Sequence, residues 1–378
     1  MNPLLGVFLH GVGGFASASF YVPIKFVRKW RWEVAWIVMG IVAWLVTPMV
    51  VATITIPTWP EAIARTDARV LLLTALFGGM WGFGNVAYGL TMRYLGLGLG
   101  VAVALGTCAI FGTLIPPIVS GTFAGIFSTV GGLVVMTGVV IGALGIAING
   151  VAGVMKEREC ANADSLPEFD IKKGLAVAVV SGLFSAGFAF SLAMGSPIAE
   201  VAKSIAVDTG ARAPDSADFF KNNSTLVVTL WGGFVSNLLI CGYMLAKNKS
   251  AGDLVSAGAR LGFSNFLLCA MAGVCWYGQF FFYGMGTTQL GKDYDFSSWS
   301  LHMSFIIIFA ALWGLALREW KGTSALTRTV LWLGILEGLL IFLWSLLLVV
   351  PGIVAAYRYR QALYLLLDHP ERSAWQCL

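Results

Sequence analysis

The chain has 378 residues, of which 58% are hydrophobic and only 11% are charged. Soluble proteins carry about 25% charged residues, so this composition excludes an ordinary soluble protein and indicates one embedded in lipid. The net charge of +5 comes from basic residues in short loops between apolar runs. Such residues orient a membrane protein, so the charge gives no sign of a nucleic-acid partner.

Apolar runs long enough to cross a bilayer follow one another along the chain. In chain order, the expected membrane helices cover residues 4–26, 33–56, 69–91, 95–119, 131–155, 173–195, 224–246, 262–285, 298–317 and 328–350. Lys and Arg residues are concentrated in the first, third, fifth, seventh and ninth loops between these runs. The positive-inside rule therefore predicts that these loops are cytoplasmic and that both termini lie outside.

Two stretches in the first half of the chain resemble two stretches in the second half. Residues 14–20 (GFASASF) align with residues 182–188 (GLFSAGF), and residues 81–89 align with residues 276–284 through shared Trp, Tyr and Gly. A unit of five helices has an odd number of crossings, so its repeat enters the membrane from the other side. This pattern is typical of transporters that work by alternating access.

We therefore predict an all-α fold of about ten transmembrane helices, arranged as two inverted five-helix repeats. The first repeat covers residues 1–156 and the second covers residues 173–350. A cytoplasmic linker at 157–172 joins them, a polar insertion lies at about 197–222, and an atypical C-terminal tail follows at 351–378.

Polar side chains inside apolar helices are costly, so they are candidates for function. Asn85 and Tyr88 are three residues apart, and Gln279 and Tyr283 are four apart, so each pair shares one helix face. Amides hydrogen-bond hydroxyls both as donor and as acceptor, and aromatic rings cover the apolar face of a sugar. We predict that these four residues, together with Trp299, bind a hydroxylated substrate. The alternative is that they only join neighbouring helices, with a stabilisation under about 2 kcal/mol each.

Three further residues are candidates for proton transfer, namely His10, Asp295 and His302. The imidazole of a histidine ionises near neutral pH. Asp295, Trp299 and His302 have spacings that place them on one helix face. The alternatives are that His10 hydrogen-bonds a neighbouring helix and that Asp295 caps the N-terminus of its own helix.

The sequence has no motif of a soluble enzyme, since it contains no P-loop, no H-E-x-x-H and no G-x-S-x-G. We therefore predict a protein that is not an enzyme and that has no cofactor. Its 6 cysteines show no C-x-x-C spacing, which argues against a metal site. Without a P-loop, uphill transport has to draw on an ion gradient.

Several of these stretches resemble one protein family. They are His10-Gly11, residues 17–23 (SASFYVP), residues 80–96 (MWGFGNVAYGLTMRYLG), residues 276–283 (WYGQFFFY) and residues 298–305 (SWSLHMSF). Over about residues 1–335, the chain is similar to the L-rhamnose/proton symporter family of the drug/metabolite transporter superfamily. The resemblance implies a multi-pass protein of a bacterial inner membrane that takes up L-rhamnose, or a related 6-deoxy sugar, with protons. The expected partners are the sugar, protons and the lipid bilayer, and a homodimer is left open.

From about Leu336 the sequence departs from this family. Residues 343–353 (LWSLLLVVPGI) and 364–370 (YLLLDHP) instead resemble a different, poorly characterised family of bacterial membrane proteins. Two alternatives to sugar uptake stay open: a drug or metabolite exporter of the same fold, and a hybrid membrane protein without transport activity.

Overall fold

The computed structural model describes residues 2–119, 121, 123–127, 130–160, 170–290 and 295–336. Over these residues the regular secondary structure is helical throughout, which confirms the predicted all-α class for the described part of the chain. Up to residue 160, the elements are α1 (Pro3–Ser19), α2 (Tyr21–Ile24), α3 (Trp32–Ile41), η1 (Val42–Val46), α4 (Thr47–Thr55), α5 (Trp59–Arg65), α6 (Ala68–Leu95), α7 (Leu97–Val119), α8 (Phe123–Ile126) and α9 (Val130–Cys160). After the linker, they are α10 (Ile171–Met194), α11 (Ser196–Asp208), α12 (Pro214–Phe220), α13 (Asn222–Asn248), α14 (Asp253–Ser256), α15 (Ala259–Leu290) and α16 (Asp295–Ala316).

Within the described residues, 6 segments are long and apolar enough to cross a membrane. They are Leu4–Ile24, Trp32–Thr55, Ala68–Leu95, Ile171–Asp208, Pro214–Asn248 and Ala259–Leu290. α7, α9 and α16 coincide with three further predicted runs. A shorter apolar helix at Ala325–Leu336 begins the last predicted run, and the rest of that run lies outside the described residues. The chain is therefore a polytopic membrane protein, whereas the count of about ten helices and the inverted repeat stay predictions.

The second predicted run folds as α3, η1 and α4 in succession rather than as one regular α-helix. η1 is a π-helical turn that ends just before Pro48. A proline has no N–H to donate to the carbonyl four residues earlier, here that of Trp44. The hydrogen-bond ladder is thus interrupted at this point, and a π-turn accommodates the interruption.

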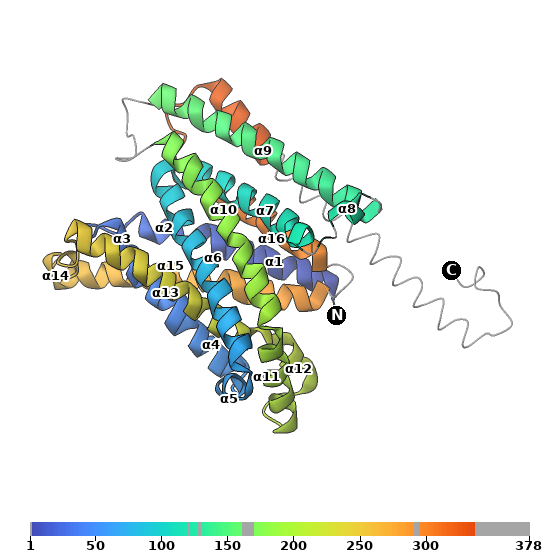
Figure 1. The fold of residues 1–378 in the computed structure, drawn as a ribbon. Coiled ribbons are helices and arrows are strands. Elements are labelled where there is room, and N and C mark those ends of the chain that lie inside the picture. Colours follow the sequence, from blue (N-terminus) through green and yellow to red (C-terminus); the bar gives the residue numbers. More distant parts are fainter. Residues whose placement is uncertain are drawn as a thin grey trace.

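The polar insertion predicted at 197–222 folds into α11 and α12, which lie beside α5 at one end of the molecule (Figure 1). The core beneath them contains Ala52, Ile56, Trp59, Ala62, Ala202, Ile205, Ala206, Ala217 and Val227. The Arg212 guanidinium donates hydrogen bonds to the carbonyls of Ile54 and Thr55, at 3.0 Å for Thr55. These carbonyls belong to the last turn of α4 and lack partners in their own helix. The insertion therefore both covers and caps this end, which the predicted topology places outside.

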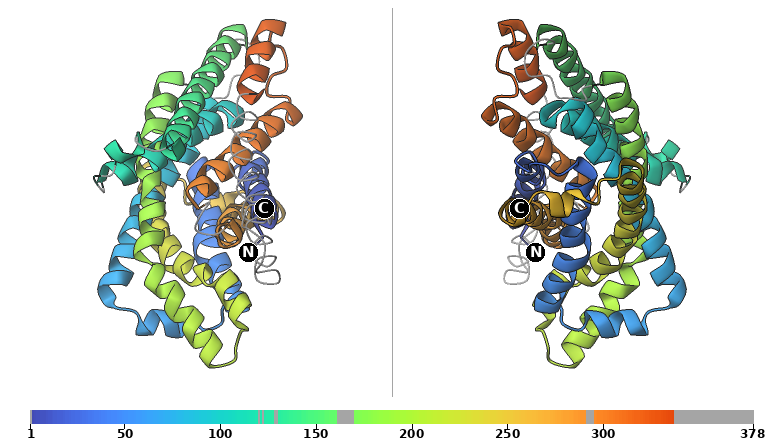
Figure 2. Two further views of the ribbon diagram at one scale, coloured as in Figure 1. Left: turned by 90° about the vertical axis from the view of Figure 1, so that its right-hand side faces the viewer. Right: turned by 90° about the vertical axis from the view of Figure 1, so that its left-hand side faces the viewer.

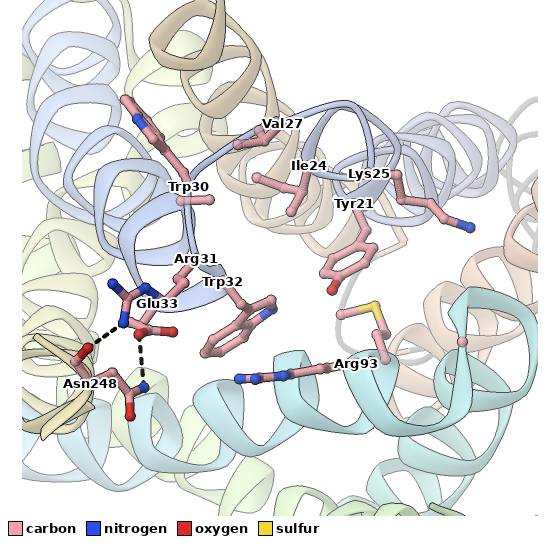
Figure 3. Close-up of a pocket in the computed structure, with 13 residues that line it drawn as sticks. Tyr21, Ile24, Lys25, Val27, Trp30, Arg31, Trp32, Glu33, Arg93 and Asn248 are labelled. Carbon is pink, nitrogen blue, oxygen red and sulfur yellow. Dashed lines mark hydrogen bonds between the residues drawn. The ribbon is translucent and has the colours of Figure 1, made fainter. Parts of the chain in front are cut away.

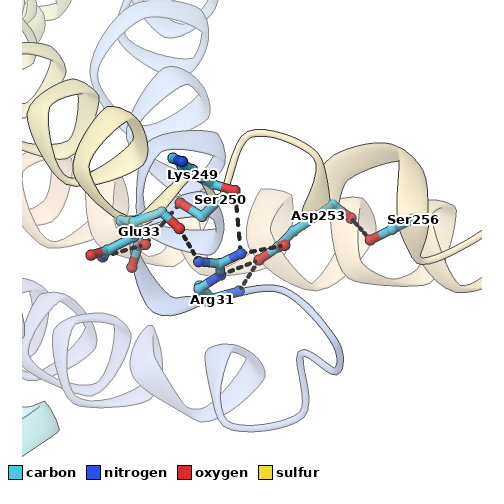
Figure 4. A network of polar contacts seen from close by, with 7 residues as sticks. Arg31, Glu33, Lys249, Ser250, Asp253 and Ser256 are labelled. Atoms are coloured by element: carbon cyan, nitrogen blue, oxygen red, sulfur yellow. Dashed lines mark hydrogen bonds and ion pairs between the residues drawn. The ribbon is translucent and has the colours of Figure 1, made fainter.

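At the other end of α13, a polar network joins the start of α3 to the turn before α14 (Figure 4). Arg31 donates to Asp253 Oδ2 through its Nε at 3.1 Å and through its backbone N–H at 3.0 Å. These hydrogen bonds hold the pKa of Asp253 below its ordinary value, and the pKa of Arg31 is raised in return. Glu33 Oε1 accepts hydrogen bonds from Asn248 Nδ2 and Ser250 Oγ, both at 2.8 Å. Residues from opposite halves of the chain are thereby held together at the predicted cytoplasmic end.

α9 runs along one edge of the molecule beside the segment that begins at Ser324 (Figure 2). The Glu159 carboxylate accepts hydrogen bonds from the backbone N–H of Ser324 at 2.6 Å and from the Thr327 hydroxyl at 2.7 Å. Ala152, Trp320 and Leu331 pack together in this contact. A carboxylate satisfies the otherwise unpaired N–H groups at the start of a helix, so Glu159 fixes the beginning of the last described segment.

Candidate functional site

A small buried cavity lies where α1, α6, α7, α10, α15 and α16 meet. Its volume is about 40 Å³. The lining residues are Ser17, Trp81, Asn85, Tyr88, Ala104, Leu105, Cys108, Ser181, Ser185, Trp276, Gln279, Phe280, Trp299 and Met303. We call this the central cavity. It has room for a few water molecules and is far below the roughly 300–1,000 Å³ of ligand pockets, so helices have to move apart before a sugar can enter.

Four of the five residues predicted to bind substrate line the central cavity, namely Asn85, Tyr88, Gln279 and Trp299. The fifth, Tyr283, lies one helical turn beyond Gln279 on α15 and does not line it. Its ring instead contacts that of Trp299 edge-on, with the ring centroids 5.8 Å apart. Tyr283 therefore belongs to a neighbouring cluster that adjoins the cavity through Trp299.

Five hydrogen-bonding atoms of cavity residues are buried without a hydrogen-bond partner in the described part of the chain. They are Asn85 Nδ2, Tyr88 Oη, Trp276 Nε1, Gln279 Nε2 and Trp299 Nε1. Buried polar groups are nearly always paired, so such atoms need an explanation. The indoles of Trp36 and Trp44 also lack partners among the described residues. What marks the site is therefore that the five residues carrying these atoms all line one cavity.

Ser17 sets the orientation of the Gln279 amide. Its hydroxyl donates a hydrogen bond to Gln279 Oε1 at 2.8 Å, in a fully buried contact. An amide has one acceptor oxygen and one donor nitrogen, so this bond leaves the Gln279 NH₂ group for a ligand. Ala104, Leu105, Phe280 and Met303 add apolar side chains to the lining. The cavity thus offers both polar and apolar groups.

Sequence reasoning did not assign Ser17, Ser181 or Ser185 to the site. Serine is common in membrane helices, where its hydroxyl usually bonds the carbonyl four residues earlier. Ser185 does so with Ser181, at 2.7 Å. A signal was nevertheless present, because Ser17 and Ser185 occupy equivalent positions in the aligned stretches 14–20 and 182–188.

The two predicted proton-transfer histidines lie together beside the central cavity. His10 and His302 have ring centroids 5.7 Å apart, and Tyr283 contacts both rings, at 5.3 Å and 5.2 Å. His10 Nε2 hydrogen-bonds the Ser298 hydroxyl at 2.9 Å. The Nδ1 atoms of both histidines are buried, with no partner elsewhere in the described chain.

Glycines on the facing helices make room for the imidazoles. A Cβ atom on Gly286 would come within 2.9 Å of His10 Nε2, and one on Gly13 within 2.9 Å of His302 Cε1. The side chain of the third candidate, Asp295, lies outside the described residues. Within the described residues, no group of three His, Cys, Asp or Glu side chains is placed to hold a metal ion.

Apolar helices around a buried, partly polar cavity define a membrane transport protein. The family model described as L-rhamnose-proton symport protein matches residues 2–350. An L-rhamnose-proton symporter of Yersinia pestis (strain Pestoides F) is 38% identical over 335 residues, covering 88% of this chain and 94% of that protein. One from Escherichia coli O17:K52:H18 (strain UMN026 / ExPEC) is 39% identical over 332 residues, covering 87% and 93%. No solved structure matches the chain.

The chain therefore belongs to the L-rhamnose-proton symport protein family. The match reaches residue 350, further than the boundary near residue 335 that the resemblance indicated. This is a family of membrane transporters rather than of enzymes. The resemblance of residues 343–353 and 364–370 to another family stays a prediction, and these residues lie outside the described part.

Proposed function

We propose that this chain takes up L-rhamnose, or a related 6-deoxy sugar, together with protons across the bacterial inner membrane. The observation that carries the proposal is the central cavity, where five buried hydrogen-bonding groups have no partner among the described residues. Sugar hydroxyls both donate and accept hydrogen bonds, so they satisfy amide, phenol and indole groups together. The apolar lining residues suit the carbon skeleton and methyl group of a 6-deoxy sugar.

An exporter of cationic drugs is less well supported by the same cavity. None of its lining residues is acidic, whereas a cation buried in a membrane protein needs a paired negative charge. A neutral, hydroxylated substrate needs no such charge. The relatives that match this chain carry the name L-rhamnose-proton symporter, which supports the sugar.

We further propose about ten transmembrane helices in two inverted repeats, with limits at 1–156 and 173–350. Corresponding residues of the two predicted halves line one cavity, which supports this arrangement. Ser17 and Ser185 are one such pair, and Trp81 and Trp276 are another. In an inverted repeat, a site between the halves is reached from either side as one half rocks against the other.

In this proposal, Asn85, Tyr88, Gln279 and Trp299 hydrogen-bond the sugar hydroxyls. His10 and His302 exchange the proton, and Tyr283 connects them to Trp299 and hence to the sugar. Asp295 stays a candidate for proton transfer only because it is the first residue of α16. Proton and sugar movement would then be coupled by proximity, because Tyr283 contacts both imidazoles and also contacts Trp299 of the sugar site.

Uptake of radiolabelled L-rhamnose into proteoliposomes tests the function. An inward proton gradient is expected to drive accumulation above the external concentration, and a protonophore is expected to abolish it. L-Mannose, which carries a hydroxyl at C6, serves as the comparison substrate. A folded protein that moves no L-rhamnose under a gradient would exclude the proposed substrate and favour the transport-inactive hybrid.

His302→Gln is expected to separate sugar movement from proton movement. The amide fills similar space and still hydrogen-bonds, but it cannot take up a proton. Gradient-driven accumulation should therefore be lost, while exchange of labelled for unlabelled sugar across the membrane continues. The two assays are run on the same proteoliposomes.

His369→Gln provides the matched control, since His369 lies in the tail at 351–378, outside the predicted repeats. It should leave both accumulation and exchange unchanged. If His302→Gln still accumulates sugar under a gradient, the proton is not carried by His302, and His10→Gln becomes the decisive variant.

A further inference from the structure

A second, larger cavity lies at the predicted cytoplasmic end, between α2, α3 and the last turns of α6 (Figure 3). Its volume is about 480 Å³, within the roughly 300–1,000 Å³ range of small-molecule sites. We call it the inner cavity. Its lining includes Tyr21, Val27, Trp32, Glu33, Met92 and Arg93.

The charged side chains of the inner cavity already contact other side chains. Lys25 pairs with Glu319, Arg31 pairs with Asp253, Glu33 accepts hydrogen bonds from Asn248 and Ser250, and the Arg93 guanidinium lies 5.9 Å from the centroid of the Trp32 ring. Lys25, Arg31 and Arg93 are balanced in number by Glu33, Asp253 and Glu319, so an added ion would meet no excess of opposite charge. The chemistry of the inner cavity therefore favours a neutral ligand that offers hydroxyl groups.

The groups that face this space suit such a ligand. Figure 3 shows the Tyr21 hydroxyl and the Arg93 guanidinium directed toward the same space, beside the Trp32 ring. Trp32 is itself held in place by stacking on Trp36, with ring centroids 4.7 Å apart and an angle of 18°. A guanidinium supplies several fixed N–H donors and a phenol both donates and accepts, so pairs of neighbouring hydroxyls can be bound at once.

The inner cavity lies one helical turn from the central cavity along two separate helical segments. On α6, Tyr88 lines the central cavity, and Met92, four residues later, lines the inner one. Ser17 and Tyr21 are related in the same way. A helical turn rises about 5.4 Å, so the two spaces are close neighbours.

Phe20 contacts aromatic residues of both cavities. Its ring centroid lies 4.3 Å from that of Trp276 and 6.2 Å from that of Tyr88, both in the central cavity. It also lies 5.8 Å from that of Tyr21, in the inner cavity. A sugar that passes Phe20 from the central cavity would therefore next meet residues of the inner cavity.

We propose that the inner cavity is a second, weaker binding site for the transported sugar, occupied on release toward the cytoplasm. This inference rests on the proposed function. The site holds the sugar through Tyr21, Trp32 and Arg93, and it is filled after the ligand has left Gln279 and Asn85.

Equilibrium binding of labelled L-rhamnose to the purified full chain tests the proposal. The unmodified protein is expected to bind a second sugar molecule more weakly than the first. Val27→Trp fills the inner cavity with a larger ring, so it should remove the weak binding and keep the tight binding. Arg93→Met should weaken the second site about tenfold without filling it. Val255→Trp is the matched control, since Val255 on α14 is 83% exposed.

Transport in proteoliposomes of known orientation gives a second readout. Both cavity variants should raise the KM for sugar moving out of the cytoplasmic side about tenfold and leave the KM on the other side unchanged. A role in folding alone would change both KM values equally and would overturn the proposal. Saturation with one sugar per chain in a protein that transports would also overturn it, while the proposed function would stand. Absence of both binding and transport in the unmodified protein would instead overturn the proposed function.

Discussion

Gln279→Met is expected to lower the kcat/KM of L-rhamnose uptake by about 100-fold while leaving the protein folded. Methionine keeps the length and the helix propensity of glutamine but loses the amide. The sugar hydroxyls that pair with this amide would then be buried without partners, at about 1–3 kcal/mol each, and 1.4 kcal/mol corresponds to a factor of ten. Initial uptake rates in proteoliposomes measure the effect.

The loss of a hydrogen bond from Ser17 and a control variant on the same helix decide how this test is interpreted. Ser17 loses its acceptor in the variant, but a serine in a membrane helix can turn to the carbonyl four residues earlier. Gln289→Met is the control on the same helix, because the Gln289 side chain accepts only an exposed hydrogen bond from the backbone of Asn2 among the contacts described. Equal uptake by both variants would show that the central cavity does not hold the sugar.

Gly232→Ala is expected to destabilise the protein strongly. α6 and α13 approach so closely that a Cβ on Gly232 would lie 2.0 Å from the carbonyl oxygen of Ala75 and 2.9 Å from the backbone nitrogen of Gly79. Backbone atoms cannot turn aside as a flexible side chain can, so the helices have to separate. Overpacking typically costs about 1–3 kcal/mol, and a clash with backbone lies at the upper end. Thermal unfolding of the purified protein in detergent should show a lower midpoint.

Gly242→Ala on the same helix is the matched control. A Cβ at Gly242 meets no heavy atom within 4 Å in the structure. Alanine favours a helix over glycine by about 1 kcal/mol, so this change should leave the midpoint unchanged or raise it. If Gly232→Ala unfolds at the same temperature as Gly242→Ala, the close approach of α6 and α13 is not required for stability.

The helices were predictable because hydrophobic length alone locates a membrane helix. Asn85 and Tyr88 were predictable as a pair because a spacing of three residues fixes their relative direction. The same rule was less informative for Gln279 and Tyr283. They share a face of α15, but one helical turn separates the central cavity from the histidine cluster, so the two residues reach different spaces.

Other parts of the site could not be predicted from the sequence. α7 contributes Ala104, Leu105 and Cys108 to the central cavity, and nothing distinguishes these side chains from those facing lipid. The inner cavity depends on where the chain between α2 and α3 lies against the end of α6. Contacts between segments so far apart in sequence follow from packing, which hydropathy and spacing do not encode.

In the proposed alternating-access cycle, the helices α11 and α12 make the two access states unequal in free energy. The halves of an ideal inverted repeat would exchange roles, and its two access states would have equal free energy. In the proposed cycle, the state closed at this end carries an extra apolar core and the Arg212 contacts with α4, which have to break whenever this end opens. We therefore expect the resting transporter to favour the conformation closed at this end. We expect an antibody fragment that holds α11 and α12 against α5 to arrest turnover while leaving the central and inner cavities untouched.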